Sequence, residues 1–264
     1  MSEMIRKLAV NGTELHVLET GAGDTALVFL HYWGGSSRTW TGVVEALGGR
    51  WRALAYDHRG WGDSAKTGED FGLDVMTEDA AALIAALGLR RYVLVGNSMG
   101  GKVAQKLAAR RPEGLEALVL VAPAPPTPID LSPQEKAMRL ASYDSAETVN
   151  GMLDALLTRS VAPEVRQRTI VDTLKGAPAA KRAWVDVGMA EDIGVEVARV
   201  TVPTLVITGT RDMVDPEPVL RREIGGRLPQ ARFVVLEGIG HFSPIEAPGE
   251  VAAAIMTFLG ALDL

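Results

Sequence analysis

The sequence predicts an α/β fold in which a mostly parallel sheet of eight strands is flanked by helices. Short apolar runs alternate with helical segments of roughly 10–15 residues, which is the pattern of βαβ units. Residues 25–31 are almost purely apolar, as expected for a strand that is buried on both faces. Asn11 and Gly12 separate two alternating segments at 5–10 and 14–20, which indicates a hairpin at the start of the sheet.

The remaining elements follow the same rhythm as far as residue 121. A strand ends in the glycine-rich turn at 96–101, and a helix then continues to Arg111. Gly88 is well placed to cap the end of an alanine-rich helix. Further strands are expected at 51–56, 115–121, 203–208 and 232–236, and further helices at 37–47, 74–87, after Pro216 and from about 244 to 262.

Prolines interrupt this rhythm between residues 123 and 128, because proline continues neither a strand nor a helix. Residues 132–189 carry helical periodicity and no run typical of a buried strand. We therefore expect a helical insertion at 126–197 that lies over the ends of the strands. The core domain then consists of 1–125 and 198–264.

Composition excludes several classes of function. Hydrophobic residues make up 47% of the chain and charged residues 23%, which is enough to form a sizeable core. The net charge of -6 and the lack of a basic tract argue against nucleic acid or an anionic membrane as partner. The sequence has no cysteine, so disulfides and thiol catalysis are excluded. The first seven residues lack the apolar core of a signal peptide, and a cytoplasmic protein is expected.

The stretch Gly96-Asn97-Ser98-Met99-Gly100 matches the pattern G-x-S-x-G. In this motif the serine lies on a tight bend between a strand and a helix, which lifts its hydroxyl out of the sheet. The helix that follows places backbone N–H groups and a positive dipole end beside the hydroxyl. Ser98 is therefore a candidate nucleophile.

Two other interpretations compete for the same residues. Gly96, Gly101 and Lys102 fit most of a phosphate-binding loop, but Val103 stands where that loop needs a Ser or Thr for magnesium. An ordinary turn with an inert serine is the second alternative.

A serine hydroxyl needs an adjacent base to act as a nucleophile at neutral pH. Of the four histidines only His241 follows Ser98, as the order serine, acid, histidine requires. Asp212 and Asp215 both follow the strand at 203–208 and could orient this imidazole. Asp212 is favoured because it lies closer to the strand end, and because Asp215 precedes a proline and suits a helix N-cap. The alternative for His241 is a surface loop residue.

An oxyanion hole needs two preorganised N–H donors. One is expected to be the N–H of Met99, the residue after the nucleophile. The second is expected from the loop at 31–35, which follows an earlier strand.

Taken together, these motifs resemble those of the α/β-hydrolase superfamily over essentially the whole chain. The resemblance is to the branch of esterases, carbon–carbon hydrolases and perhydrolases that carry a helical cap after the sixth strand. It rests on His31 with its aromatic-glycine loop, Asp57-x-Arg59-Gly60-x-Gly62-x-Ser64, the Gly-Asn-Ser98-Met-Gly-Gly turn, Pro203 through Asp212, and Gly240-His241.

The resemblance implies further roles. It places the second oxyanion donor on the N–H of Trp33, and it implies that Asp57 and Arg59 hold loops together. His31 is expected to be a loop histidine whose ring nitrogens are hydrogen-bonded. The chain departs from the family in having Tyr32 where glycine usually follows the histidine.

The sequence thus predicts a serine hydrolase of a small or medium carboxylic ester or lactone, acting through an acyl-enzyme. Ser98, His241 and Asp212 would be catalytic, and neither a cofactor nor a metal is required. The expected partner is a small ester-like molecule, and the sequence carries no signal for an oligomeric state. One alternative is a carbon–carbon hydrolase of vinylogous diketones, whose carboxylates would bind cations of the insertion, Arg159, Arg166, Arg168, Lys175, Lys181 and Arg182. A non-catalytic receptor of a small ligand is the other.

Overall fold

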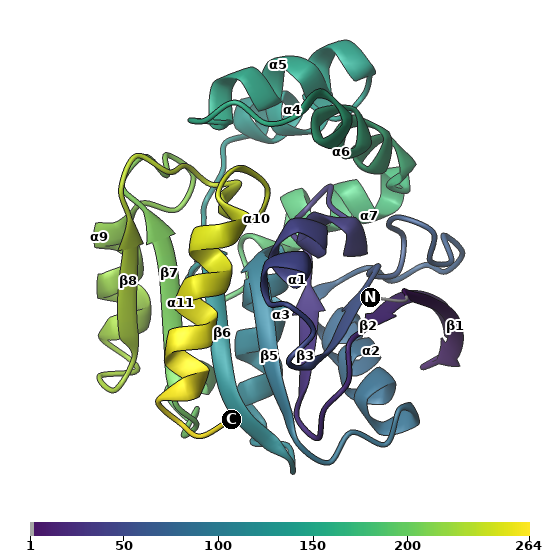
Figure 1. Ribbon diagram of the computed structural model, residues 1–264. Coiled ribbons are helices and arrows are strands. Elements are labelled where there is room, and N and C mark those ends of the chain that lie inside the picture. The colour runs from purple at the N-terminus through teal and green to yellow at the C-terminus, as the bar shows by residue number, and fades with distance from the viewer. Residues whose placement is uncertain (1–2) are drawn as a thin grey trace.

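The sheet has eight strands in the order β1-β2-β4-β3-β5-β6-β7-β8 (Figure 1). In the computed structural model, which describes residues 3–264, β1 pairs antiparallel with β2 and β2 with β4, and all other neighbours are parallel. The predicted mostly parallel sheet is confirmed. The strands are β1 (Met4–Val10), β2 (Thr13–Thr20), β3 (Ala26–Leu30), β4 (Arg52–Tyr56), β5 (Tyr92–Ser98), β6 (Leu115–Pro123), β7 (Thr204–Gly209) and β8 (Arg232–Leu236).

The first two strands form the hairpin that Asn11 and Gly12 predict. Both residues have positive φ, 46° and 70°, which is the conformation that a tight two-residue turn requires. Val10 and Thr13 pair directly across the turn.

Helices cover both faces of the sheet. In β3, Leu27 and Phe29 pack toward α1 (Thr41–Ala46) and α11 (Pro248–Gly260). Val28 and Leu30 pack on the opposite side, toward α2 (Leu73–Ala86) and α3 (Met99–Ala109). Because both sides of β3 are covered, its sequence is a continuous apolar run.

Two predicted helices are divided in the structure. The helix expected at 37–47 begins as a 3₁₀ turn, Ser37–Trp40, before α1. The helix expected from 244 to 262 is α10 (Ser243–Glu246) followed by α11, with a break at Ala247, whose φ and ψ are -142° and 47°. The residue before a proline avoids helical angles, and Ala247 precedes Pro248.

Between β6 and β7 the chain forms a set of helices, of which α4, α5 and α6 lie above the ends of the strands (Figure 1). A small apolar cluster that includes Tyr32, Leu153 and Phe242 packs between α5, α6 and the loops beneath. The helices of this segment are α4 (Pro133–Ala141), α5 (Ala146–Leu156), α6 (Pro163–Lys175), α7 (Pro178–Ala183), a π-helical turn (Trp184–Gly188) and α8 (Gly194–Val197), and the sheet then continues through β7, α9 (Glu217–Leu220), a second π-helical turn (Arg221–Gly225) and β8.

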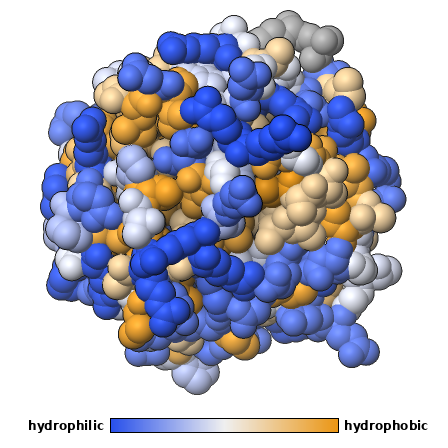
Figure 2. All heavy atoms as spheres, turned by 90° about the horizontal axis from the view of Figure 1, so that it is seen from below, coloured by the Kyte–Doolittle hydropathy of each residue, from blue (hydrophilic) through white to orange (hydrophobic). Residues whose placement is uncertain are grey.

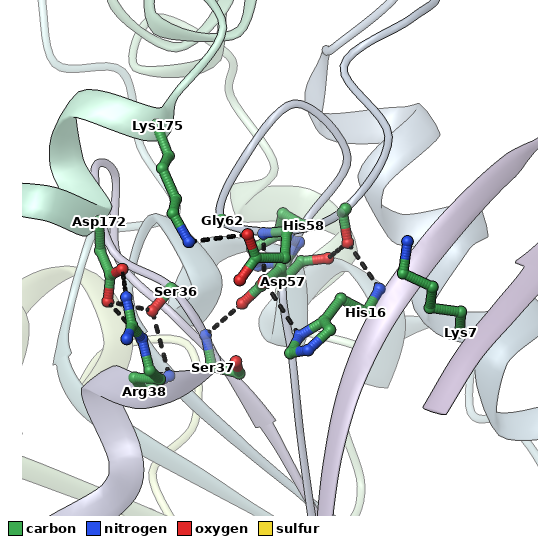
Figure 3. Close-up of polar contacts among 12 residues, drawn as sticks. Lys7, His16, Ser36, Ser37, Arg38, Asp57, His58, Gly62, Asp172 and Lys175 are labelled. Carbon is green, nitrogen blue, oxygen red and sulfur yellow. Dashed lines mark hydrogen bonds and ion pairs between the residues drawn. The ribbon is translucent and has the colours of Figure 1, made fainter. Parts of the chain in front are cut away.

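Helix α6 is attached to the core by two ion pairs and a hydrogen bond, which Figure 3 shows. Asp172 accepts hydrogen bonds from Ser36 Oγ at 2.7 Å and from Arg38. One turn further on, the Lys175 ammonium lies 2.7 Å from Asp63 Oδ1. These contacts fix the base of the helical segment to the loops after β3 and β4.

Asp57, directly after β4, joins β2 to the loops after β3 and β4 (Figure 3). Its carboxylate accepts hydrogen bonds from the backbone N–H groups of Ser37 and Asp63, and His16 Nδ1 lies 3.2 Å from Oδ2. Burial raises the pKa of Asp57, but His16 and the two N–H donors outweigh burial and hold the pKa below its usual range. The contacts agree with the loop-holding role that was expected for this residue.

The guanidinium of Arg59 forms a buried ion pair with Asp79 of α2. Its Nε and Nη2 each lie 2.5 Å from an oxygen of that carboxylate, and Nη2 also donates to the carbonyl of Asn11. Each charged group thus has a partner of opposite charge. The contacts also tie the loop after β4 to the hairpin and to α2. Arg59 thus holds loops together, as expected.

Within residues 3–264, no helix combines the length and the apolar character that crossing a bilayer requires. Figure 2 shows the face opposite α4–α6, where hydrophilic side chains cover much of the surface and apolar ones are exposed between them.

We expect Arg59→Leu to lower the free energy of unfolding by about 3–5 kcal/mol, because it leaves the Asp79 carboxylate buried without a positive charge, with only the amide of Asn11 as a donor. The matched control is Arg110→Leu, which removes an exposed pair with Glu78 and should cost about 0–1 kcal/mol. Urea denaturation of both variants measures the difference. Equal losses would contradict the structural role of Arg59.

Candidate active site

Ser98 lies at the junction of β5 and α3, with φ 50° and ψ -116°. A non-glycine residue in this region is strained by about 1–3 kcal/mol, and such strain persists only where the surroundings enforce it. Here the surroundings are backbone. A Cβ at Gly96 would collide with the carbonyl of Gly100, and a Cβ at Gly100 would collide with the carbonyls of Leu30 and His31. Both glycines are therefore required for the turn to pack against β3.

The structure brings Ser98, His241 and Asp212 together in one hydrogen-bonded chain. His241 Nε2 lies 3.0 Å from Ser98 Oγ, and His241 Nδ1 lies 3.0 Å from Asp212 Oδ2. A carboxylate only accepts, so Nδ1 carries the proton and Nε2 is free to accept one from the hydroxyl. The three side chains come from the turns after β5, β7 and β8, at one edge of the sheet.

Asp212 is held in place by its own loop. Its Oδ1 accepts hydrogen bonds from the backbone N–H groups of Val214 and Asp215, each at 2.9 Å. These two donors stabilise the carboxylate and orient it toward the imidazole.

The imidazole of His241 is buried beside this carboxylate. Burial by itself lowers the pKa of His241, but the charge of Asp212 and its hydrogen bond outweigh burial and raise the pKa above the ordinary value of 6.5. Asp215 adds to the same effect. The surroundings therefore stabilise the imidazolium form, which a base needs after it takes a proton.

The prediction that Asp215 is a helix N-cap is wrong. The N-cap of α9 is Pro216, and no side chain caps the helix. Asp215 is instead buried, and its Oδ2 lies 4.0 Å from His241 Nδ1. The loop turns the side chain back toward the imidazole, which a local sequence pattern does not reveal.

The loop after β3 passes close to Ser98. The backbone N–H of Trp33 donates to no acceptor among residues 3–264. Met99 is the first residue of α3, where N–H groups lack partners within the helix. The indole of Trp33 stacks on Tyr143 with ring centroids 3.9 Å apart, and its Nε1 donates to the carbonyl of Lys181. These contacts hold the loop after β3 against the helical segment.

Tyr32, the departure from the usual glycine, forms part of the wall of the site. It is buried, and its ring contacts Phe242 edge-on with centroids 5.0 Å apart. Its neighbour His31 is buried and does not line the pocket. His31 Nδ1 lies 2.7 Å from the carbonyl of Tyr32, and Nε2 accepts from the backbone N–H of His58, so both ring nitrogens are hydrogen-bonded, as expected.

A pocket of about 420 Å³ opens over Ser98 and His241. Most of its wall is apolar and comes from the helical segment above, in particular Ile129, Met138, Tyr143, Met152, Leu156 and Trp184. Such a pocket suits a small, largely apolar molecule.

The sequence analysis missed the two charged residues of α4 that line this pocket, Glu135 and Arg139. None of the six cations named for the insertion lines it. Arg159 and Arg166 form ion pairs with Glu250 and Asp154 instead. The guanidinium of Arg139 donates to no side chain or carbonyl among residues 3–264, so its charge faces the pocket and solvent. No periodicity in the sequence separates it from the paired arginines.

Other polar clusters have structural explanations. His16, Asp57 and Asp63 each offer a metal-ligating atom within 4.8 Å of the others. Asp57 accepts from the Ser37 amide and contacts His16, and Asp63 pairs with the Lys175 ammonium, so these contacts account for the cluster without a metal. Lys102, the lysine of the phosphate-loop alternative, is fully buried and donates to the carbonyls of residues 188, 189 and 191. It therefore faces away from any phosphate in the pocket.

Comparison with known proteins agrees with this geometry. The chain is 32% identical over 243 residues to a pimeloyl-(acyl-carrier protein) methyl ester esterase of Nitrosomonas europaea, with 86% of this chain and 92% of that protein covered. An enol-lactonase from Burkholderia xenovorans superposes with a TM-score of 0.82 at 27% identity, covering 97% of this chain and 100% of the other. A hydrolase from Pseudomonas aeruginosa superposes with a TM-score of 0.83 at 29% identity, covering 97% and 98%.

The family model described as the alpha/beta hydrolase family matches residues 27–254, which include the serine turn, both aspartates and His241. Strand order, helical layers and the position of the serine turn agree with that match. The chain therefore belongs to the alpha/beta hydrolase family.

Proposed function

We propose that this protein is a serine hydrolase that cleaves a small or medium carboxylic ester or lactone through an acyl-enzyme. The observation that carries the proposal is the chain Ser98–His241–Asp212, with 3.0 Å at both links, at the floor of a pocket of about 420 Å³. The relatives named as a methyl ester esterase and an enol-lactonase support the ester and lactone class.

In the proposed reaction Ser98 Oγ attacks the acyl carbon while His241 Nε2 takes the hydroxyl proton. The imidazolium that results is stabilised by Asp212. The C–O bond of the ester then breaks, and the alkoxide leaves with the proton of His241. Water attacks the acyl-enzyme in the second half, again giving its proton to His241, and the acid product leaves Ser98 free.

The oxyanion would lie between the N–H groups of Trp33 and Met99. The Trp33 amide has no acceptor among residues 3–264, and the Met99 amide is at the start of a helix, so both N–H groups could donate to an anion. Stacking on Tyr143 fixes the loop of Trp33 in advance. Preorganised donors of this kind gain most in a site from which water is excluded.

We also propose that residues 126–197 act as a cap domain over a core of 1–125 and 198–264. Helices α4 and α5, the π-helical turn at Trp184 and the loops beside them supply most of the apolar wall, so they would set which acyl and alcohol groups fit. Neither a metal nor an organic cofactor has a step in this mechanism.

The carbon–carbon hydrolase alternative retains one supporting observation, the unpaired Arg139 in the pocket, which would suit a carboxylate-bearing substrate. Two of the cations first considered for that role, Arg159 and Arg166, form ion pairs with Glu250 and Asp154 instead. Turnover of a dienoic diketone acid in preference to p-nitrophenyl acetate would favour this alternative. A bound small molecule that survives purification unhydrolysed would favour the receptor.

We expect Ser98→Ala to lower kcat for p-nitrophenyl esters by about 10⁴-fold or more, because the nucleophile is lost. A fluorophosphonate probe should label the wild type at Ser98 alone, as peptide mapping can show. Ser160→Ala, an exposed serine of the same segment that forms the pocket wall, is the control and should keep full activity. Labelling at another residue would refute the assignment.

We expect Asp212→Asn to reduce kcat by about 10³–10⁴-fold, because an amide does not hold the imidazole tautomer or stabilise its cation. Steady-state kinetics of this variant and of Asp74→Asn, an exposed control, measure the effect. A loss no larger than that of the control would exclude Asp212 as the partner of His241.

The pH dependence of kcat/KM should reflect the effect of the neighbouring groups on the pKa of His241. Because the raised pKa belongs to a base that acts when neutral, kcat/KM should fall on the acidic side with a midpoint above 6.5. The midpoint should move down in Asp212→Asn, which removes the main charge that raises it. A midpoint that Asp212→Asn leaves unchanged would show that another group controls the acidic limb.

A further inference from the structure

Asp215 has no role in the mechanism above, yet it lies in the same pocket. Its side chain is 3% exposed and borders the pocket together with Ser98 and His241. The 4.0 Å between Asp215 Oδ2 and His241 Nδ1 exceeds hydrogen-bond distance, and the proton of Nδ1 is already directed to Asp212.

The carboxyl of Asp215 lacks a hydrogen-bond partner among residues 3–264. Its backbone N–H donates to Asp212, but no side chain or amide donates to its oxygens, and it does not cap α9. The carboxyl borders the pocket, so its hydrogen-bond partner comes from a molecule that the pocket holds.

The charged and titratable groups that border the pocket with Asp215 are His241 and, from α4, Glu135 and Arg139. Asp212 lies in the same loop as Asp215, and Lys102 of α3 is buried outside the pocket, where it donates to carbonyls. Burial and the charge of Asp212 raise the pKa of Asp215, whereas His241, Arg139 and Lys102 lower it, and the balance raises the pKa to about 7. Near neutral pH the group is therefore shared between carboxylic acid and carboxylate. Both forms can accept a hydrogen bond, and the carboxylate accepts more strongly.

We propose that Asp215 is a specificity-determining residue whose carboxyl accepts a hydrogen bond from a hydroxyl group on the acyl part of the substrate. The inference rests on the proposed ester hydrolysis and narrows its substrate class to hydroxy esters. A neutral donor fits best. Arg139 disfavours a cationic ligand group, and a ligand carboxylate would face the partly ionised Asp215.

Matched pairs of esters test the proposal. Ethyl 6-hydroxyhexanoate is compared with ethyl hexanoate, and ethyl 3-hydroxybutyrate with ethyl butyrate, in a pH-stat. The readout is the ratio of kcat/KM for the hydroxy ester to that for its unsubstituted partner. We expect Asp215→Leu to lower this ratio about tenfold in at least one pair, the effect of one hydrogen bond. A ratio that matches the wild type in both pairs would overturn the proposal.

A pH series distinguishes contact from packing. His241 serves both esters of a pair, so its ionisation cancels in the ratio. We expect the wild-type ratio to rise between pH 6 and pH 8 as Asp215 loses its proton, and to stay constant in Asp215→Asn, which keeps an acceptor oxygen but does not ionise. The same pH dependence in both proteins would assign it to another group and overturn the role of Asp215.

Binding to Ser98→Ala separates this inference from the proposed function. Calorimetry with the intact esters gives a Kd ratio for each pair without turnover, in Ser98→Ala and in Ser98→Ala/Asp215→Asn at pH 8. If the wild type cleaves no ester but the hydroxyl preference falls in the second protein, ester hydrolysis is refuted and the role of Asp215 stands. If esters are cleaved and the preference is the same in both, the role of Asp215 is refuted alone.

Discussion

The contact between the β5–α3 turn and the backbone at the end of β3 is the constraint on which the site depends. Gly96 and Gly100 leave no space for a Cβ, so the turn rests directly on the carbonyls of Leu30 and His31. That support is what keeps Ser98 at a positive φ in spite of its strain of about 1–3 kcal/mol. It is rigid because β5 is an interior strand, paired with β3 on one side and β6 on the other. The same contact brings the loop of Trp33, which follows β3, close to the serine hydroxyl.

Much of the fold could be predicted because its signals are local. The apolar run of β3, the Asn11-Gly12 turn and the glycines around Ser98 each act within a few residues. The pairing of Asp212 with His241 could also be predicted, because both follow strands that end at one edge of a parallel sheet. The break at Ala247 was missed although Pro248 signals it, since the apolar periodicity continues across the proline.

The roles that the sequence did not reveal depend on how the helices pack against one another. Arg139, Arg159 and Arg166 all lie in the segment between β6 and β7, in helices or beside one, and nothing in their neighbours separates them. Arg159 meets Glu250 of α11 and Arg166 meets Asn150 and Asp154 of α5, contacts that exist only after packing. Arg139 is left facing the pocket because α4 lies over it, and because the acid of that helix that borders the pocket, Glu135, accepts hydrogen bonds from Ser132 instead. For the same reason the Asp-Pro pattern at 215–216 indicated a cap, whereas the tertiary fold turns Asp215 toward His241.

The two aspartates of this loop show how one short turn gives identical groups different chemistry. Asp212 receives two backbone N–H donors and contacts the imidazole, so its charge is matched on every side. Asp215 receives no donor among residues 3–264, and burial raises its pKa to about 7, so its charge is penalised. The loop thus holds one carboxylate against His241, where it stabilises the imidazolium, and directs the other to the pocket, where a hydroxyl of the substrate would meet it as we propose.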